Sequence, residues 1–198
     1  MTDYQPSLFS AAEAGGSYRV VPKTLTMSQS ALSDWKQRVG QFQQQVRSHL
    51  PPEQGSLFAA ESPQTMQPTQ TPAAEAINPF DLPQQNIEFW RWRAADAGVS
   101  ALYFVIDYES SLLLYVGETV KSNQRWKGEH DCKRYLLNYR QAHVEHNLPT
   151  QLGIAFWHGA PAATRPRQAL ESALISRWRS PFNKENWRIW ATPFIGSP

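Results

Sequence analysis

Residues 100–117 read SALYFVIDYESSLLLYVG. This stretch holds two apolar runs, 100–107 and 111–117, in which the aliphatic and aromatic residues that favour strands dominate. Only the polar segment 108–110 separates them. The pattern therefore predicts an antiparallel β-hairpin.

Side-chain alternation along these two strands predicts where their tyrosines lie. In the first strand Tyr103 is expected on the face opposite Leu102, Phe104 and Ile106. The second strand is expected to alternate strictly, with Leu113 and Tyr115 opposite Leu112, Leu114 and Val116. Tyr103 and Tyr115 can then share one face of adjacent strands.

The chain after the hairpin predicts one more strand and two helices. Helical residues are expected from Arg125 through Tyr139, while residues 151–158 (QLGIAFWH) have the composition of a third strand. A second helix is expected over residues 165–179, because its apolar residues recur at helical spacing. That stripe consists of Leu170, Leu174, Ile175 and Trp178. The expected fold is α+β, a small three-stranded antiparallel sheet flanked by helices.

The first 86 residues have a different composition. They are rich in Gln, Pro, Ser, Thr and Ala, which favours disorder because too little apolar area is available to offset the chain entropy. One helix is expected at residues 30–48, with Ser30 or Ser33 as N-cap and an apolar stripe that packs either on the folded domain or on a partner. The stripe consists of Leu32, Trp35, Val39, Phe42 and Val46. The domain boundary is expected near Asn86, which leaves residues 87–198 as the folded domain.

Charge is unevenly distributed along the chain. Residues 1–90 hold five Lys/Arg and eight Asp/Glu, whereas residues 91–198 hold fourteen and nine, so their net charges are −3 and +5. A basic domain behind an acidic segment suits a polyanionic partner. The one cysteine, Cys132, excludes an internal disulfide and a thiolate zinc cluster. Without an apolar leader or a spanning segment, we expect a soluble cytoplasmic protein with no membrane partner.

Several short motifs in the second half occur at defined intervals. Ala101-Leu102-Tyr103 is followed by Tyr115-Val116-Gly117, and Arg125 lies eight residues after that glycine. Glu171 is followed by Leu-Ile at plus three and plus four, by Pro181, and by Asn183 at plus twelve. Together these motifs, which cover roughly residues 99–187, resemble those of the GIY-YIG nucleases.

The resemblance implies a role for each of these residues. Tyr103 would activate the attacking water, Tyr115 would orient the water or the phosphate, and Arg125 would stabilise the charge of the transition state. Glu171 would hold one Mg²⁺ or Mn²⁺ ion, to which a carboxylate is well suited. Asn183 would anchor its loop near Glu171 or contact phosphate.

The chain departs from the family pattern at two places, and at the first of them Ala101-Leu102 replaces Gly-Ile. Many relatives have a histidine four residues after the arginine, where this chain has Glu129, and His130 follows one residue later. His130 is thus a weaker candidate for the catalytic set.

Basic residues around Arg125 predict a contact surface for the DNA backbone, with an ordinary solvated face as the alternative. They are Lys121, Lys127, Lys133, Arg134 and Arg140.

A five-residue motif, Gln-x-Ser-Leu-Phe, occurs twice in the polar first part, at residues 5–9 and 54–58. It resembles the peptide by which bacterial replication and repair proteins bind the sliding clamp, the beta subunit of DNA polymerase III. Alternatively, each Leu-Phe pair packs back on the domain. The residues that would contact the clamp are Gln5, Leu8, Phe9, Gln54, Leu57 and Phe58.

The function that these features imply is a metal-dependent DNA endonuclease, recruited by the clamp and associated with the nucleoid. Branched, flapped, nicked or mismatched DNA in repair, recombination or replication is the expected substrate, since the chain has no long reading helix or zinc finger. The alternatives are a catalytically inactive adaptor that binds clamp and DNA, and a restriction-type endonuclease.

Overall fold

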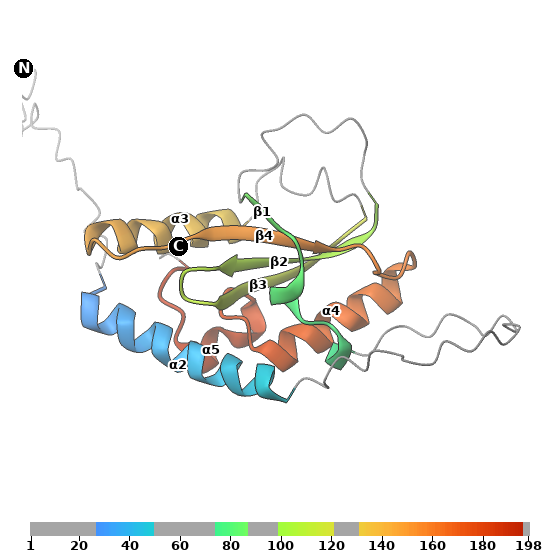
Figure 1. Ribbon diagram of the computed structural model, residues 1–198, viewed down its shortest axis with the longest axis horizontal. Helices are drawn as coiled ribbons and strands as arrows, with labels where there is room; N and C mark the ends of the chain where they lie inside the picture. The colour runs from blue at the N-terminus through green and yellow to red at the C-terminus, as the bar shows by residue number, and fades with distance from the viewer. Residues whose placement is uncertain (1–26, 50–73, 87–98, 121–130, 196–198) are drawn as a thin grey trace, which may run out of the picture.

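A computed structural model describes residues 27–49, 74–86, 99–120 and 131–195 (Figure 1). Its centre is a four-stranded antiparallel sheet in the order β1-β4-β2-β3. The strands are β1 (Gln84–Asn86), β2 (Ala101–Asp107), β3 (Leu112–Thr119) and β4 (Leu152–Trp157). The predicted hairpin is β2 and β3, and the predicted α+β class is confirmed.

The sheet has four strands instead of the three expected. The additional strand β1 pairs with β4, with Gln85 opposite Ile154. Its sequence is Gln-Gln-Asn and all three residues are exposed, so it lacks the apolar alternation by which a strand is recognised in a sequence. The backbone pairing with β4 determines its conformation.

Within the described residues, the three long helices that surround the sheet are α2 (Gln29–Ser48), α3 (Asp131–Glu145) and α4 (Thr164–Trp178). Both faces of β2 are covered, so all seven of its residues are buried. Leu102, Phe104 and Ile106 pack with the apolar stripe of α4, whereas Tyr103 and Val105 pack with α2 and α3. The alternation predicted for this strand is confirmed.

Strand β3 does not alternate strictly, and that part of the prediction is wrong. Val105 pairs with Tyr115 and Ile106 pairs with Leu113, which leaves Leu114 as an extra residue in a β-bulge. The bulge moves Leu112 and Leu114 to the face of Tyr103. Tyr115 packs against that same face, as predicted, while Leu113 and Val116 lie on the other.

Helix α2 packs on the domain, which decides between the two alternatives for its apolar stripe. Leu32, Trp35 and Val39 are buried in the core with α3, and the Trp35 indole donates a hydrogen bond to the Trp190 carbonyl (3.1 Å). The N-cap is Ser28, whose hydroxyl accepts from the Ala31 amide, two residues before the first expected cap.

Residues 74–86 also belong to the folded unit. They comprise two short 3₁₀ helices, η1 (Ala74–Ala76) and η2 (Pro79–Asp81), followed by β1. Ala74 and Ile77 are buried against the α4 side of the sheet. The folded unit therefore extends upstream of the boundary expected near Asn86.

The outer edge of β3, beside α2 and α4 (Figure 1), is closed by side chains and by the C-terminal segment. The side-chain amide of Gln43 on α2 accepts a hydrogen bond from the Leu113 backbone N–H (2.8 Å) and donates one to the Leu113 carbonyl (2.9 Å). The Phe182 amide donates to the Leu114 carbonyl (2.9 Å). These bonds satisfy backbone groups that an open edge strand would leave available for aggregation.

The C-terminal segment continues through η4 (Lys184–Asn186) and α5 (Trp187–Trp190). Phe182, Trp190 and Phe194 complete the core on the Tyr103 side. None of the helices in the described part of the chain combines the length and the apolar character needed to cross a bilayer.

Candidate functional site

Two tyrosines from adjacent strands stack at the centre of the hairpin. The rings of Tyr103 on β2 and Tyr115 on β3 have centroids 5.9 Å apart and planes 29° apart. Tyr103 lies directly opposite Gly117 in the strand pairing. A Cβ atom on Gly117 would lie 2.4 Å from the Tyr103 hydroxyl oxygen. Only glycine therefore leaves room for this phenol to cross β3.

Tyr115 on β3 lies close to residues from three other elements. Tyr103 comes from β2, Cys132 from the first turn of α3, and Glu171 from α4. Burial, followed by the electrostatic effects of Tyr103, Cys132 and Glu171, raises the pKa of Tyr115 well above its ordinary value. At neutral pH Tyr115 is consequently a neutral phenol that can donate a hydrogen bond, and it is not a base.

Glu171 supplies the carboxylate of this site. It is half-buried on α4, next to the fully buried core residue Leu174, and its charge acts on Tyr115. No cluster of three or more His, Cys, Asp or Glu residues within the described ranges could enclose a metal ion. One carboxylate beside two phenols still fits Mg²⁺ or Mn²⁺, because such ions keep several waters and need only one or two protein carboxylates.

Asn183 is buried and bound to the backbone of β3. Its Oδ1 accepts hydrogen bonds from the Val116 amide (3.0 Å) and the Ser180 hydroxyl (2.6 Å), and its Nδ2 donates to the Val116 carbonyl (2.9 Å). Val116 lies between Tyr115 and Gly117. Of the two roles expected for Asn183, this geometry fits the anchor rather than the phosphate contact.

Replacing Asn183 with alanine is expected to lower the free energy of unfolding by about 1 to 3 kcal/mol, because the Val116 amide and carbonyl lose their buried partner. Denaturant unfolding measures this loss. Lys184→Ala is the control, since Lys184 is the exposed neighbour. Equal stability of the Asn183 and Lys184 variants would show that the amide does not anchor β3.

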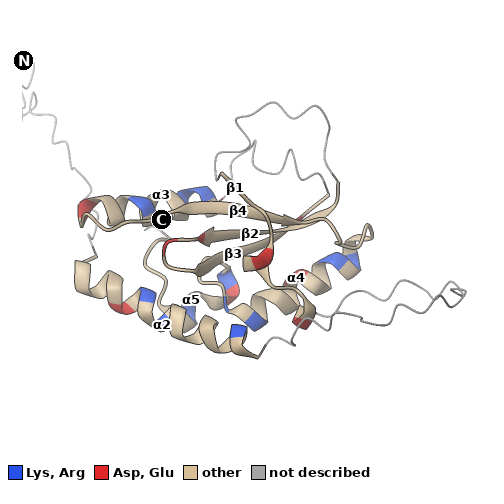
Figure 2. Ribbon diagram, in the orientation of Figure 1, with Lys and Arg blue, Asp and Glu red and all other residues tan. Residues whose placement is uncertain are grey.

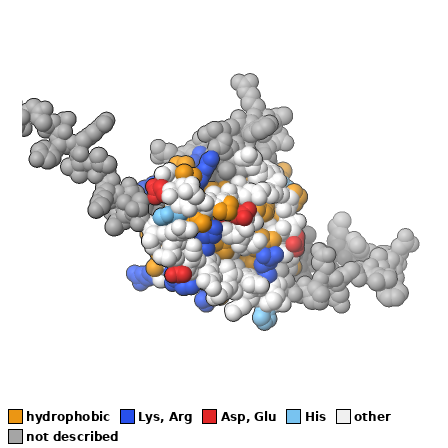
Figure 3. Space-filling model, turned by 60° about the vertical axis from the view of Figure 1, so that its left-hand side comes forward, with side chains coloured by type: hydrophobic (Ala, Val, Ile, Leu, Met, Phe, Trp, Pro, Cys, Tyr) orange, Lys and Arg blue, Asp and Glu red, His pale blue; other side chains and the backbone are white. Residues whose placement is uncertain are grey.

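Basic side chains gather at the start of α3, close to Cys132. Lys133 is half-buried and Arg134 is exposed, and both were predicted to contact DNA. Arg134 and the unpredicted Lys184 pair with Asp131 at 3.7 and 3.4 Å. Figure 2 shows basic residues on α3. On the face of the molecule drawn in Figure 3, the Lys and Arg side chains are dispersed among apolar and acidic side chains.

Arg140, predicted with Lys133 and Arg134, is exposed on α3. The other predicted site residues lie outside the described residues. They are Lys121, Arg125, Lys127 and His130, and the clamp-binding residues Gln5, Leu8, Phe9, Gln54, Leu57 and Phe58.

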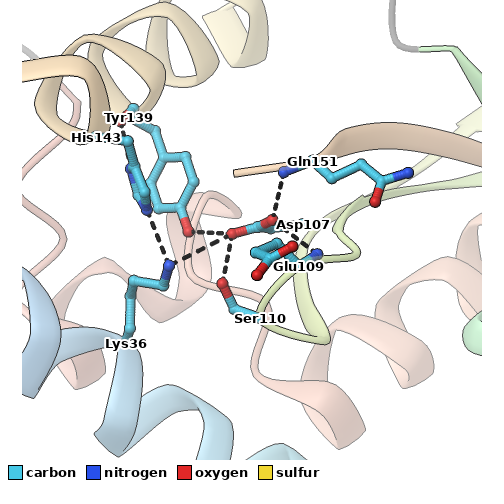
Figure 4. Close-up of polar contacts among 7 residues, drawn as sticks. All are labelled: Lys36, Asp107, Glu109, Ser110, Tyr139, His143 and Gln151. Atoms are coloured by element: carbon cyan, nitrogen blue, oxygen red, sulfur yellow. Dashed lines mark hydrogen bonds and ion pairs between the residues drawn. The ribbon is translucent and has the colours of Figure 1, made fainter. Parts of the chain in front are cut away.

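A second polar cluster surrounds Asp107, at the hairpin end of β2 (Figure 4). The buried Asp107 carboxylate accepts hydrogen bonds from the Ser110 hydroxyl (2.6 Å), the Tyr139 hydroxyl (2.8 Å) and the backbone N–H of Gln151 (3.0 Å). Lys36 of α2 lies 3.6 Å from the same carboxylate. The cluster therefore links α2, β2 and α3, about 13 Å along the strand from Tyr103.

The cluster also includes the buried His143. Its Nε2 lies 2.9 Å from the Lys36 ammonium group, and its Nδ1 lies 2.8 Å from the Tyr139 carbonyl. A neutral imidazole with its proton on Nδ1 satisfies both contacts, since it accepts from Lys36 and donates to Tyr139. Burial lowers the pKa of His143, the hydrogen bond to the Tyr139 carbonyl and the charge of Asp107 oppose this effect, and Lys36 and His146 add to it.

This cluster was not among the predicted sites. The available signal was Asp107 itself, a carboxylate that ends an otherwise apolar strand on the Tyr103 face. Its partners Lys36 and Tyr139 are distant in the sequence, and they carry no local pattern that pairs them with it.

The His143 site predicts that the domain is less stable in mild acid. Because the pKa of His143 is lower in the folded than in the unfolded chain, the unfolded chain binds more protons below about pH 6.5. The free energy of unfolding should therefore fall as the pH decreases through that range. Asp107, whose pKa is also lowered, contributes a loss of the same sign at more acidic pH.

The measurement is urea unfolding from pH 7.5 to 5 for the wild type and His143→Gln. The glutamine variant should lose less stability over this range, because it removes the proton uptake. His158→Gln is the control, since His158 is exposed. A pH dependence that His143→Gln leaves unchanged would contradict the assignment.

Comparison with protein-family models, with curated proteins and with solved structures found no match to this chain.

Proposed function

We propose that this chain is a metal-dependent endonuclease that hydrolyses DNA phosphodiester bonds at the Tyr103–Tyr115–Glu171 site. One observation supports this more than any other. Residues from β2, β3 and α4 converge, so that Tyr115 stacks on Tyr103 and experiences the charge of Glu171. These are the positions to which the resemblance to GIY-YIG nucleases assigns catalytic roles.

In the proposed reaction, a water oxygen forms a bond to phosphorus and the bond from phosphorus to the 3′ oxygen breaks. The products are a 5′-phosphate and a 3′-hydroxyl. Tyr103 takes the proton of the attacking water while its own phenolic proton passes to a neighbouring base, and the leaving 3′ oxygen ends protonated. Tyr115, held neutral by its surroundings, donates a hydrogen bond that orients the water or the phosphate.

Negative charge increases on the phosphate as the water attacks. Glu171 would hold Mg²⁺ or Mn²⁺, and the bound ion would supply positive charge near the phosphate. Arg125 is proposed to add a second positive charge, in keeping with its interval of eight residues from Gly117. Asn183 keeps β3 in place between Tyr115 and Gly117.

The proposed substrate is branched, flapped, nicked or mismatched DNA in the nucleoid. Lys133 and Arg134 would contact its backbone next to the site, together with Lys121 and Lys127. The motifs at residues 5–9 and 54–58 would recruit the chain to the sliding clamp. Two motifs on one chain allow binding with avidity to a ring that offers several pockets.

One observation favours a second function, a catalytically inactive adaptor that binds clamp and DNA. The Tyr103 side chain is fully buried, whereas a residue that activates water must be reached by it. As an adaptor, the chain would use the same clamp motifs and basic residues without cleavage.

The test is a panel of end-labelled duplex, nicked, flap, fork, four-way junction and mismatched DNAs with Mg²⁺ or Mn²⁺. Each is incubated with wild type or Tyr103→Phe, with and without the cognate clamp. The nuclease proposal predicts metal-dependent cutting that Tyr103→Phe reduces. Cutting should be stimulated by the clamp, and the stimulation should be lost in a Phe9→Ala/Phe58→Ala variant. Intact clamp binding with no cutting of any DNA would support the adaptor.

A further inference from the structure

An ion pair between the buried Arg167 and the half-buried Glu118 joins α4 to the end of β3. Arg167 lies in the first turn of α4 and its side chain is fully buried. Its Nε donates to the Glu118 carboxylate at 2.5 Å. Its Nη1 donates to the carbonyls of Pro161 (3.0 Å) and Ala162 (2.8 Å), just before the helix. One guanidinium group thus holds the end of β3, the start of α4 and the loop that leads into it.

The ion pair lies next to the tyrosine–carboxylate site on both elements. Glu118 directly follows Gly117, three residues after Tyr115. Arg167 precedes Glu171 by four residues, so the two lie about one turn apart on one side of α4. A change in the contact between Arg167 and Glu118 would therefore shift Glu171 relative to Tyr115.

A second polar contact holds the opposite ends of the same two elements. The Gln43 side chain binds the Leu113 backbone and also donates to the Trp178 carbonyl (3.2 Å). Tyr115 lies between Leu113 and Glu118 on β3, and Glu171 lies between Arg167 and Trp178 on α4. The two contacts fix the helix on the strand at points on either side of the site.

Stability alone does not account for this ion pair. The Arg167 Nη2 atom is buried and has no hydrogen-bond partner. Packed apolar residues often replace a buried ion pair at no loss of stability, or with a gain. A geometric role explains why a charged pair occupies this place, because a planar guanidinium fixes both distance and direction.

We propose that Arg167, acting through Glu118, is a positioning residue that sets the separation of Glu171 and Tyr115. The inference rests on the proposed function in one respect, since it takes these two residues as the reactive site. Neither Arg167 nor Glu118 resembles a catalytic residue of the family pattern, and neither needs to touch DNA.

The test compares Arg167→Met, Glu118→Gln and the double variant in the full chain. Each single variant leaves one charged group without its partner, the buried Arg167 or the half-buried Glu118, and should unfold more easily, whereas the double variant should regain most of that loss. Arg177→Met is the matched control, because Arg177 lies on the same helix and pairs at 3.9 Å with the exposed Glu75.

Three measurements then distinguish a positioning role of Arg167 from a role in stability alone. The ring resonances of ¹³C-labelled Tyr115 should shift in the double variant and not in Arg177→Met. Mn²⁺ binding, measured by calorimetry, should weaken. Single-turnover cleavage should fall about 100-fold, the size of effect that a misplacement of about 1 Å produces.

Failure of the positioning role and failure of the nuclease proposal give different results. A stable double variant with unchanged Tyr115 resonances would overturn the positioning role, whatever the activity of the chain. A wild type that neither cuts DNA nor binds Mn²⁺ through Glu171 would instead count against the nuclease, while the Tyr115 resonances would still decide whether Arg167 sets the geometry.

Discussion

Replacing Glu171 with glutamine is expected to lower the single-turnover rate of DNA cleavage by about 100- to 1,000-fold. Glutamine has almost the same shape but no negative charge, so the proposed site loses its ligand for Mg²⁺ or Mn²⁺. Removing one electrostatic contribution to a transition state often costs about 100- to 1,000-fold. The rate would be measured with labelled flap or fork DNA at saturating enzyme.

DNA binding provides the internal control for this prediction. The dissociation constant of the glutamine variant should stay close to that of the wild type, because contacts to the phosphate backbone determine most of the affinity. Glu145→Gln is a matched surface control, since Glu145 is exposed at the end of α3. Cleavage by Glu171→Gln at the wild-type rate would show that this carboxylate is not part of the reactive site.

Replacing Gly117 with alanine is expected to be the most damaging single-methyl change near the site. The new Cβ would lie 2.3 Å from the Tyr103 Cζ atom, and Tyr103 is fully buried, so the ring or β3 has to move. Overpacking of this kind costs about 1 to 3 kcal/mol of stability. Because the displaced ring is one of the two proposed catalytic phenols, cleavage should fall by about 100-fold or more.

Denaturant unfolding and single-turnover cleavage test both parts of this prediction. Gly40→Ala is the control, because its Cβ would lie 3.3 Å from the Leu112 Cδ2 atom, a much less severe approach than the one at Gly117. Alanine also favours a helix over glycine by about 1 kcal/mol, so this control should keep its stability and its activity. A Gly117→Ala variant that matches Gly40→Ala in both measurements would contradict the packing of Tyr103 across Gly117.

Local patterns in the sequence were sufficient to predict the strand and the helix that carry Tyr103 and Glu171. The alternation in residues 100–107 placed Tyr103 opposite Leu102, Phe104 and Ile106, as observed. The stripe in α4 likewise predicted the buried residues from Leu170 to Trp178. In both cases a repeated apolar spacing matches the period of the element, so burial on one face follows directly from the sequence.

Other features depend on contacts that no local pattern contains. The bulge at Leu114 shifts the side chains of β3 by one residue, yet Leu112, Leu113 and Leu114 are identical in type and give no signal of it. Gln43 reads as a polar surface residue of a helix, but its amide closes the edge of β3. Arg167 and Glu118 are separated by 49 positions. Such partners become evident only when the elements are brought together.

The chemistry of the ends that the protein produces would test the central proposal most directly. Purified full-length wild type and Glu171→Gln would be incubated with branched DNA and Mg²⁺, and the products tested as substrates for DNA ligase and for extension by a polymerase. We expect wild-type products with 5′-phosphate and 3′-hydroxyl ends that both enzymes accept, and no products from Glu171→Gln. Folded wild-type protein that leaves every DNA intact, or equal products from both proteins, would contradict a nuclease site at Tyr103, Tyr115 and Glu171.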